Sequence, residues 1–228
     1  MKFLRSALPL VLTIAMVAAG TTRASAQVKH LAGGYFLGSW PTGDWGEVAG
    51  FGTGLDATDI IHKGPEKLLS WRVTTSLLYN WSRTQGVPQQ NLAPTSKLDL
   101  ETKNWSLMFG IGPELAKHGA SVTPFVYATA GFDTYWTSST LSGTALGLPY
   151  SADHGDSRIT FAWASGLGAR REITPGHMGE ISLEYRAALN HHFVIPDQVT
   201  ESGGTVVANR DNHTSNQFLL RVGTVFSQ

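Results

Sequence analysis

A histidine and a serine two residues apart, in the stretch His213-Thr214-Ser215-Asn216, have the chemistry to cleave an ester. An imidazole can remove the proton of a nearby serine hydroxyl, which makes the oxygen a nucleophile toward a carbonyl carbon. Such a pair also needs an acidic group to orient the imidazole. No acidic residue stands at a position that a motif defines, so the spacing alone does not predict a catalytic site.

Several histidines and aspartates lie in polar segments of the second half of the chain, and both residue types can bind transition metals. These residues are His154, His191, His192, His213, Asp153, Asp156, Asp197 and Asp211. They lack the tight spacing of a metal motif and are divided among separate segments. We therefore interpret them as polar residues of solvated loops, and we expect neither a metal nor a cofactor.

The first 26 residues have the composition of a secretory signal peptide. Two basic residues precede an apolar run at 7–19, and Ala24-Ser25-Ala26 supplies the small residues of a cleavage site. The apolar run is shorter than the roughly 20 residues that a membrane helix needs. We therefore predict that residues 1–26 are removed and that residues 27–228 form one folded domain.

Charges are sparse and nearly balanced. The chain holds 17 basic and 17 acidic residues, and three of the basic ones lie in the predicted signal peptide, so the remainder carries a net charge of −3. A protein that binds nucleic acid would show a basic excess. Charged residues make up 15% of the chain, against about 25% in ordinary soluble domains. There is no cysteine, so an exported chain of this kind must be held together by its core or its backbone hydrogen bonds.

Period-2 alternation marks eight segments as β-strands with two different faces. The clearest segment, at about 67–82, alternates mainly large side chains at odd positions with mainly polar ones at even positions. The last segment needs a partner strand, and the first segment could supply it by closing a barrel. The segments lie at about 30–40, 49–61, 67–82, 99–114, 121–137, 157–173, 179–195 and 215–228. The predicted fold class is all-β: an eight-stranded antiparallel up-and-down transmembrane β-barrel preceded by a cleaved signal peptide.

The connections between these segments alternate in length. Short turns rich in Gly and Pro are expected around 62–65, 117–119 and 174–177. The long connections cover 41–48, 83–98, 138–156 and 196–213. Short turns at one end and long loops at the other are typical of outer-membrane barrels, and an even strand number then places both chain ends at the short-turn, periplasmic end.

Aromatic residues on one face indicate which side of the sheet meets the membrane. Trp71 and Trp81 share a face, and the ten residues between them span about 33 Å, or about 25 Å along the membrane normal when the strand is tilted by about 40°. That is the height of the apolar band on such barrels, whose edges amphipathic rings prefer. The predicted membrane-interface aromatics are Trp71, Trp81, Trp105, Trp136, Trp163 and Phe226.

The opposite face carries charged side chains. In an eight-stranded barrel the lumen is filled by side chains, and an isolated buried charge is very costly, so opposite charges there must pair. The predicted lumenal charge network consists of Arg72, Asp133, Arg158, Arg170, Glu184, Arg186 and Arg221. Glycines of the same parity would leave room for the long arginine side chains.

These features together resemble the small eight-stranded outer-membrane β-barrel superfamily, which includes the outer-membrane protein A-like transmembrane domains. The similar stretches are the glycine-rich segment 33–38 with the 41–44 turn, 124–131, 165–170 and the alternating last strand. Members of the superfamily end in a strand with a terminal aromatic that the barrel assembly machinery reads. Phe226 matches that position, although two residues follow it. The resemblance implies the assembly machinery, outer-membrane lipid and lipopolysaccharide as partners.

The stretch His213-Thr214-Ser215-Asn216 also resembles the His-x-Ser-Asn stretch of outer-membrane lipid A deacylases, which are barrel enzymes whose reactive groups face the membrane. Here His213 and Ser215 share parity with Arg221, which belongs to the face expected to point inward. This parity argues against lipid A hydrolysis, and we expect no enzymatic activity.

The sequence therefore predicts an integral protein of the bacterial outer membrane with a structural or surface-interaction role, in which the long extracellular loops contact a partner. The alternatives are a narrow pore for small solutes, a barrel hydrolase that modifies lipid A, and a soluble lipocalin-like carrier. A pore requires an open lumen, whereas a lipocalin requires the apolar face to point inward.

Overall fold

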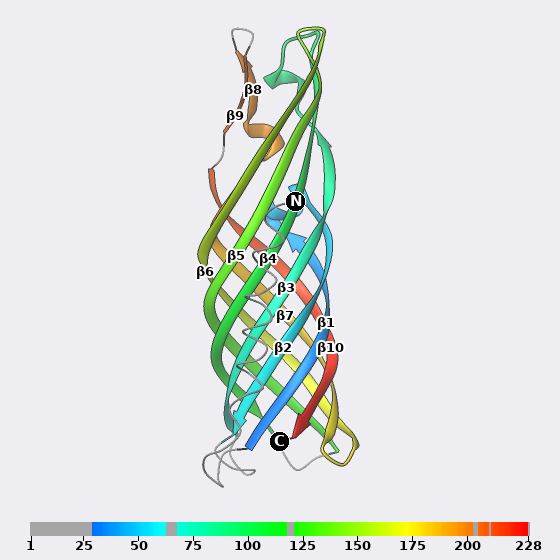
Figure 1. Cartoon of the computed structure of the whole chain (residues 1–228), viewed down its shortest axis with the longest axis vertical. Coiled ribbons are helices and arrows are strands. Elements are labelled where there is room, and N and C mark those ends of the chain that lie inside the picture. Colours follow the sequence, from blue (N-terminus) through cyan, green and yellow to red (C-terminus); the bar gives the residue numbers. More distant parts are fainter. Residues whose placement is uncertain (1–28, 63–67, 118–120, 203–204, 210, 228) are drawn as a thin grey trace, which may run out of the picture.

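Eight antiparallel strands close into a tall barrel in which each strand is hydrogen-bonded to its neighbours in sequence (Figure 1). They are β1 (Lys29–Thr42), β2 (Ala49–His62), β3 (Leu69–Gly86), β4 (Lys97–Ala116), β5 (Val122–Ala145), β6 (Leu148–Thr174), β7 (His177–Phe193) and β10 (Asp211–Ser227). The barrel closes where β1 pairs with β10, from Leu31 opposite Ser227 to Thr42 opposite Asn216. The predicted up-and-down barrel, with its first and last strands paired, is confirmed.

The computed structural model describes residues 29–62, 68–117, 121–202, 205–209 and 211–227. The predicted signal peptide lies outside the described residues, as do parts of the predicted turns at 62–65 and 117–119. Both described ends of the barrel lie at one rim, together with the β6–β7 turn, where Gly176 has a φ of 79°. No helix in the described part of the chain is long and apolar enough to cross a membrane.

The two faces of the barrel strands differ sharply, because the strands alternate apolar and polar side chains. Phe36, Leu167 and many other large apolar side chains point outward and are exposed, whereas arginines such as Arg72 and Arg221 are fully buried inside. This arrangement is the reverse of a soluble lipocalin, whose apolar face lines the interior.

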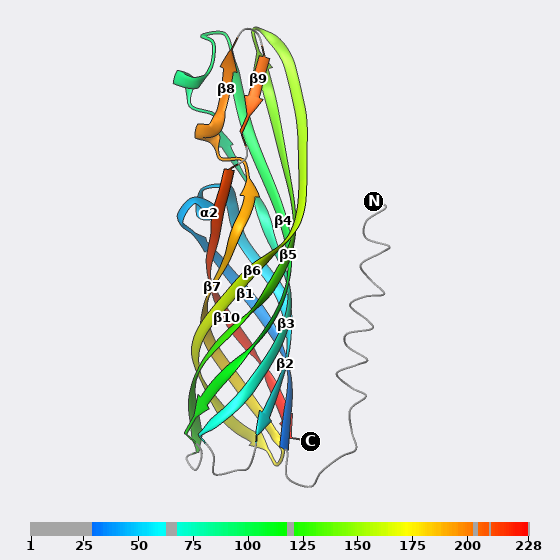
Figure 2. The same ribbon diagram turned by 90° about the vertical axis from the view of Figure 1, so that its left-hand side faces the viewer.

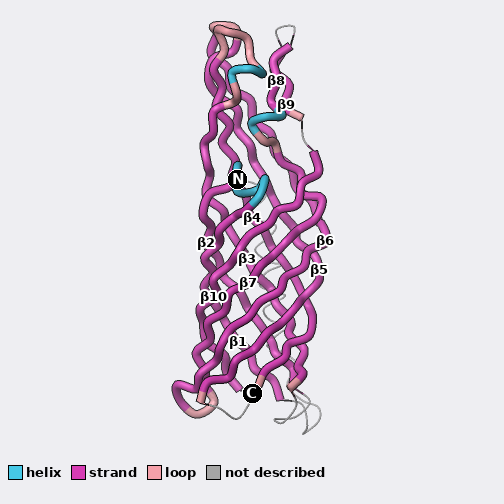
Figure 3. The backbone as a smooth tube through the Cα atoms, turned by 180° about the vertical axis from the view of Figure 1, so that it is seen from behind, coloured by secondary structure: helices cyan, strands magenta, loops and turns pink. Residues whose placement is uncertain are grey.

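The rim opposite the termini carries most of the irregular structure (Figures 2 and 3). The four segments predicted as long connections lie at this rim, and each of them contains helix or strand residues. Residues 138–156 belong mostly to β5 and β6, which meet in a tight turn at Leu146 and Gly147. The remaining elements are the helix α2 (Gly43–Val48), the 3-10 helices η1 (Gln89–Asn91) and η2 (Pro196–Gln198), and a separate two-stranded sheet of β8 (Val199–Ser202) and β9 (Thr205–Ala208).

We call α2, η1, η2, β8 and β9 the distal cap. The cap has a hydrophobic core of its own, which includes Trp45 and Val48 of α2, Leu141 of β5, and Phe193 beside η2. Burial of these side chains explains why the loops are ordered, because polar loops without an apolar core could not offset their conformational entropy.

Candidate functional site

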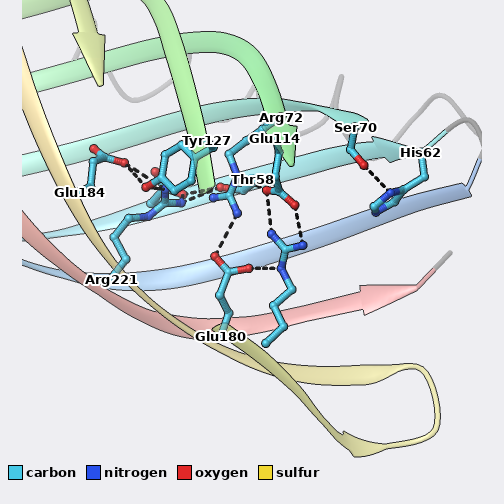
Figure 4. Close-up of polar contacts among 11 residues, drawn as sticks. Thr58, His62, Ser70, Arg72, Glu114, Tyr127, Glu180, Glu184 and Arg221 are labelled. Atoms are coloured by element: carbon cyan, nitrogen blue, oxygen red, sulfur yellow. Dashed lines mark hydrogen bonds and ion pairs between the residues drawn. The ribbon is translucent and has the colours of Figure 1, made fainter. Parts of the chain in front are cut away.

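A closed ring of ion pairs crosses the lumen near the rim at which the described barrel begins and ends (Figure 4). Arg72 of β3 donates to Glu114 of β4 at 2.7 Å and to Glu180 of β7 at 3.0 Å. Arg170 of β6 donates to both carboxylates as well, at 2.6 and 2.7 Å to Glu114. We call these four residues the ion-pair ring. Its two positive and two negative charges balance, and it connects four strands across the bore.

A second buried group lies beside this ring and is centred on Arg221 of β10. The Arg221 guanidinium donates to Asp56 of β2 at 2.7 Å and to Glu184 of β7 at 3.1 Å. Arg186 also donates to Glu184, at 2.9 Å, and the Tyr127 hydroxyl of β5 donates to the same carboxylate at 2.6 Å. The Arg221 guanidinium lies 4.6 Å from the centre of the Tyr35 ring of β1. The ion-pair ring and this Arg221 cluster therefore take side chains from all eight barrel strands.

Aromatic rings inside the lumen pack between the guanidinium groups and glycines on the barrel wall. Arg72 lies 4.3 Å from the centre of the Tyr127 ring, and Arg170 lies 4.1 Å from the centre of the Phe125 ring. A Cβ atom at Gly166 would come within 2.5 Å of Tyr127, and one at Gly168 within 2.5 Å of Phe125. These glycines are therefore required for close approach of the rings that support the charged groups.

Gly166→Ala is expected to lower the free energy of unfolding by about 1–3 kcal/mol, because the added methyl group overpacks the Tyr127 ring. Urea denaturation followed by tryptophan fluorescence in micelles measures the change. Gly34→Ala is the matched control, since a Cβ at Gly34 meets nothing within 4 Å. Equal stabilities of the two variants would contradict the packing described here.

The lumenal charge network of the sequence analysis differs from these contacts at five residues. Arg158 does not belong to the buried network. The β6–β7 ladder ends at Ala162, and Arg158 lies beyond that point toward the distal rim. Its side chain is 50% exposed and lies 3.4 Å from Asp156. Asp133 is buried in the lumen, but its carboxylate accepts a hydrogen bond from the Ser106 hydroxyl at 2.8 Å and does not join the ion-pair ring. The predicted network also lacked Glu114, Glu180 and Asp56. Glu114 ends the segment predicted at 99–114, and the alternation of that segment would have placed it inside.

The predicted interface aromatics all lie on the outward face. Trp81, Trp105 and Trp163 are exposed, and Trp136 is half-buried opposite Trp105. They join other rings in a belt on the side of the distal rim, which we call the upper belt. Its ring centroids are 5.5 Å apart for Phe51–Trp81, 4.6 Å for Tyr79–Trp105 and 5.2 Å for Tyr185–Phe218. Trp71 and Phe226 are exposed toward the other rim. Contact of these belts with the membrane interfaces stays a prediction.

Helix α2 folds back over the distal mouth of the barrel. Trp45 is 1% exposed, and its ring centre lies 4.8 Å from that of His191 and 4.9 Å from that of Phe193. A bulge between β7 and β10, with Asn190 at a φ of 54°, changes the parity of β7. This bulge turns His191 and Phe193 toward the interior, where Thr137 lies 3.0 Å from the His191 Nε2 atom.

Burial of His191, which lies beyond the upper belt, lowers the pKa of its imidazole to about 3, with smaller contributions from His192 and His213. In the unfolded chain the pKa is about 6.5. Between these values the unfolded chain binds a proton that the folded chain does not, so stability falls as the pH falls from about 6.5 toward 3.

We therefore expect acidification to loosen the distal cap, with a loss of at most about 1.4 kcal/mol per pH unit below pH 6.5. Hydrogen exchange of α2 amides at pH 7 and pH 5, corrected for intrinsic exchange rates, checks this. In His191→Phe the pH dependence should disappear, and an unchanged dependence in that variant would assign the effect to another group.

The histidine and serine of the stretch 213–216 are not brought together. His213 lies 3.1 Å from Asp44 of α2, and its ring stacks on Phe193, while Ser215 is buried. No hydrogen bond joins His213 and Ser215 in the described part of the chain. A different Ser–His pair, which sequence reasoning missed, lies near the opposite rim: Ser70 Oγ is 2.6 Å from His62 Nδ1 (Figure 4). Both side chains are buried, so a substrate could not reach that serine without rearrangement.

The candidate metal-binding residues are only partly brought together. His154, Asp156 and His192 line one small pocket between β6 and the end of β7. His192 lies 3.7 Å from Asp156 and also contacts Asn212. Among the residues that the structure describes, no group of three or more His, Asp or Glu side chains is arranged to hold a metal ion.

A closed antiparallel barrel with an apolar exterior and a lumen filled by paired charges is a transmembrane β-barrel of the small, side-chain-filled kind. The chain thus has the fold of the small outer-membrane barrels. Its relation to particular proteins of that class is distant. A scan of protein-family models finds no match, and a search of curated proteins finds none either.

Solved structures with a similar shape come from several bacteria. Ail, the attachment invasion locus protein of Yersinia pestis, solved with the heparin analogue sucrose octasulfate, has 12% identity and a TM-score of 0.44, covering 89% of this chain and 99% of its own. A major outer membrane protein of Thermus thermophilus has 12% identity and a TM-score of 0.46, covering 87% and 99%. OprG of Pseudomonas aeruginosa has 11% identity and a TM-score of 0.44, covering 88% and 95%.

Proposed function

We propose that the protein is an integral barrel of the bacterial outer membrane whose bore is closed and whose distal cap presents an ordered extracellular surface to a partner. The observation that carries this proposal is the ion-pair ring. It fills the bore with side chains from four strands whose charges are paired and buried. The outward apolar faces and the two aromatic belts support residence in a membrane.

The ion-pair ring argues against the narrow-pore alternative. An ion passing through would have to separate Arg72 and Arg170 from Glu114 and Glu180, and unpairing a buried charge is very costly. The Arg221 cluster fills a further level of the bore, and Trp45 of α2 lies over the distal mouth. The structure of the cap favours a binding role, because its own hydrophobic core fixes the shape of the surface before any partner arrives.

A catalytic role has less support. Ser215 is buried, and the imidazole of His213 is engaged by Asp44. A non-catalytic surface role therefore accounts for more of the described contacts than lipid A hydrolysis does.

Planar-bilayer recording of the purified full chain tests the closed bore. We expect no stable conductance above that of the bare lipid. A variant in which a short Gly-Ser linker replaces α2 should also remain closed, because the ion-pair ring is intact in it. A stable channel in the unaltered protein would contradict the proposal and favour the narrow pore, and a channel in the α2 variant alone would assign closure to α2.

A further inference from the structure

The upper half of β6 is paired on one side only. On the side of the distal rim, the β6–β7 ladder ends where Ala162 pairs with Ala188. Pairing with β5 continues to Leu148 opposite Ala145. Among the described residues, none is registered with residues 148–154 on the side away from β5, and no described backbone hydrogen bond outside the strands involves them. We call residues 148–154 the open edge; it lies in the wall that rises above the barrel (Figure 2).

The hairpin geometry determines which backbone groups the open edge presents. Ala145 and Leu148 flank a two-residue loop, and such flanking residues exchange hydrogen bonds with each other. Alternation then directs the N–H and C=O groups of every second residue away from β5. These are the carbonyl of Pro149 and both backbone groups of Ser151 and Asp153.

The open edge is held in place. Leu146 and Gly147 have φ angles of 50° and 79°, which fit a tight hairpin turn, and the Leu146 N–H donates to Ser96 Oγ at 2.8 Å. Tyr150 packs against the hydrophobic core of the distal cap on the inner face of the sheet. A strand fixed in this way does not have to be ordered when a partner binds, which favours addition of a further strand.

The edge carries little of the protection that natural edge strands usually have. Lysines, inward-pointing charges and bulges normally prevent pairing with another chain. Here Pro149 removes one N–H, and Asp153 is the one charged residue between 148 and 154. Leu148 is 69% exposed at the start of the edge and offers an apolar contact.

The β6 strand of a second copy in the same membrane does not fit the edge. Two upright copies are related by an axis along the membrane normal, so their β6 strands run in the same sense along that normal. An antiparallel ladder between identical strands needs an axis perpendicular to the strands. This symmetry excludes a β6–β6 ladder between upright copies, and the occupant that we consider is a different polypeptide.

We propose that the open edge binds an extended segment of another extracellular polypeptide as an additional β-strand, with a basic side chain opposite Asp153. The affinity comes from backbone hydrogen bonds to Ser151 and Asp153, and the preference for a basic segment comes from the Asp153 carboxylate. This inference rests on the proposed function for its extracellular location.

A fluorescent heptapeptide of alternating threonine and lysine is the probe, added to the full chain in lipid nanodiscs and followed by anisotropy. A peptide of the same composition with alternating D-residues has the same charge but cannot form a regular ladder. Ser151→Pro removes the outward N–H without touching the ladder to β5, and Ser151→Ala is its matched control. Heat-modifiable migration on gels shows that each variant is folded.

We expect the peptide to bind the unaltered protein and Ser151→Ala within about twofold of each other, and Ser151→Pro at least about tenfold more weakly. Asp153→Lys should also weaken binding, and the amides of Ser151 and Asp153 should exchange more slowly when the peptide is bound. The inference would be overturned if no binding occurred at millimolar peptide, or if Ser151→Pro bound the peptide equally well. It would also be overturned if the D-residue peptide bound equally well, or if phosphatidylcholine vesicles bound in place of the peptide. None of these results bears on the bilayer recordings, so failure here is distinguishable from failure of the proposed function.

Discussion

Arg170→Met is expected to lower the free energy of unfolding by about 3–5 kcal/mol, because it leaves Glu114 and Glu180 buried with Arg72 as their remaining partner in the ion-pair ring. The loss arises mainly from the excess negative charge that stays buried when two carboxylates share one guanidinium. Methionine fills much of the same space, so a cavity contributes little. Urea titration of the folded protein in micelles, read by tryptophan fluorescence, measures the change.

Two controls make the Arg170 result specific. Adding Glu114→Gln to Arg170→Met removes the excess negative charge and should restore part of the lost stability, which a double-mutant cycle separates from the single effects. Lys103→Met breaks an exposed ion pair with Glu101 and should leave the midpoint unchanged, since solvent screens such pairs. A midpoint for Arg170→Met equal to that of Lys103→Met would contradict the ring.

Trp45→Ala is expected to destabilise the distal cap by about 3–5 kcal/mol while the barrel remains folded. The indole is buried between His191 and Phe193, and no other side chain of α2 is large enough to replace it. Local opening of the cap should make α2 and β8–β9 accessible to protease added outside intact cells.

Fragment sizes from limited proteolysis, together with unchanged heat-modifiable migration, check the Trp45 result. Leu148→Ala is the matched control, because this leucine is exposed and its loss leaves no cavity. Protease resistance equal to that of the unaltered protein would show that the cap does not depend on α2.

Much of the barrel was predictable because burial on one face imposes a strict period of two. The alternation around Trp71 and Arg72 predicts both the strand and its two faces, and the observed strand places Trp71 outside and Arg72 inside. The same parity places Arg170, Glu184, Arg186 and Arg221 on the face that the structure shows to be buried.

The individual ion pairs were not predictable, because they depend on register and strand tilt. Arg72 and Glu180 are 108 residues apart and meet only when the barrel closes. Arg158 has the correct parity but lies above the last β6–β7 pair, and parity carries no information on height. Asp56 lies on a strand so rich in glycine and small residues that neither face stands out.

The distal cap and the upper part of the β5–β6 hairpin were predicted as loops because their segments have loop-like compositions. Residues 138–156 are rich in Ser, Thr and Gly, yet they continue the β5–β6 ladder beyond the barrel. The order comes from side chains that are distant in sequence, such as Trp45 and Phe193, and a local composition does not record that they pack together.

Membrane residence of the folded barrel is the central claim, and fractionation of expressing cells followed by a heat-modifiability gel tests it most directly. We predict that the chain sediments with the outer membrane, needs detergent for extraction and migrates faster before boiling than after. A chain that is recovered in the soluble periplasmic fraction without detergent, and migrates identically before and after boiling, would contradict the account.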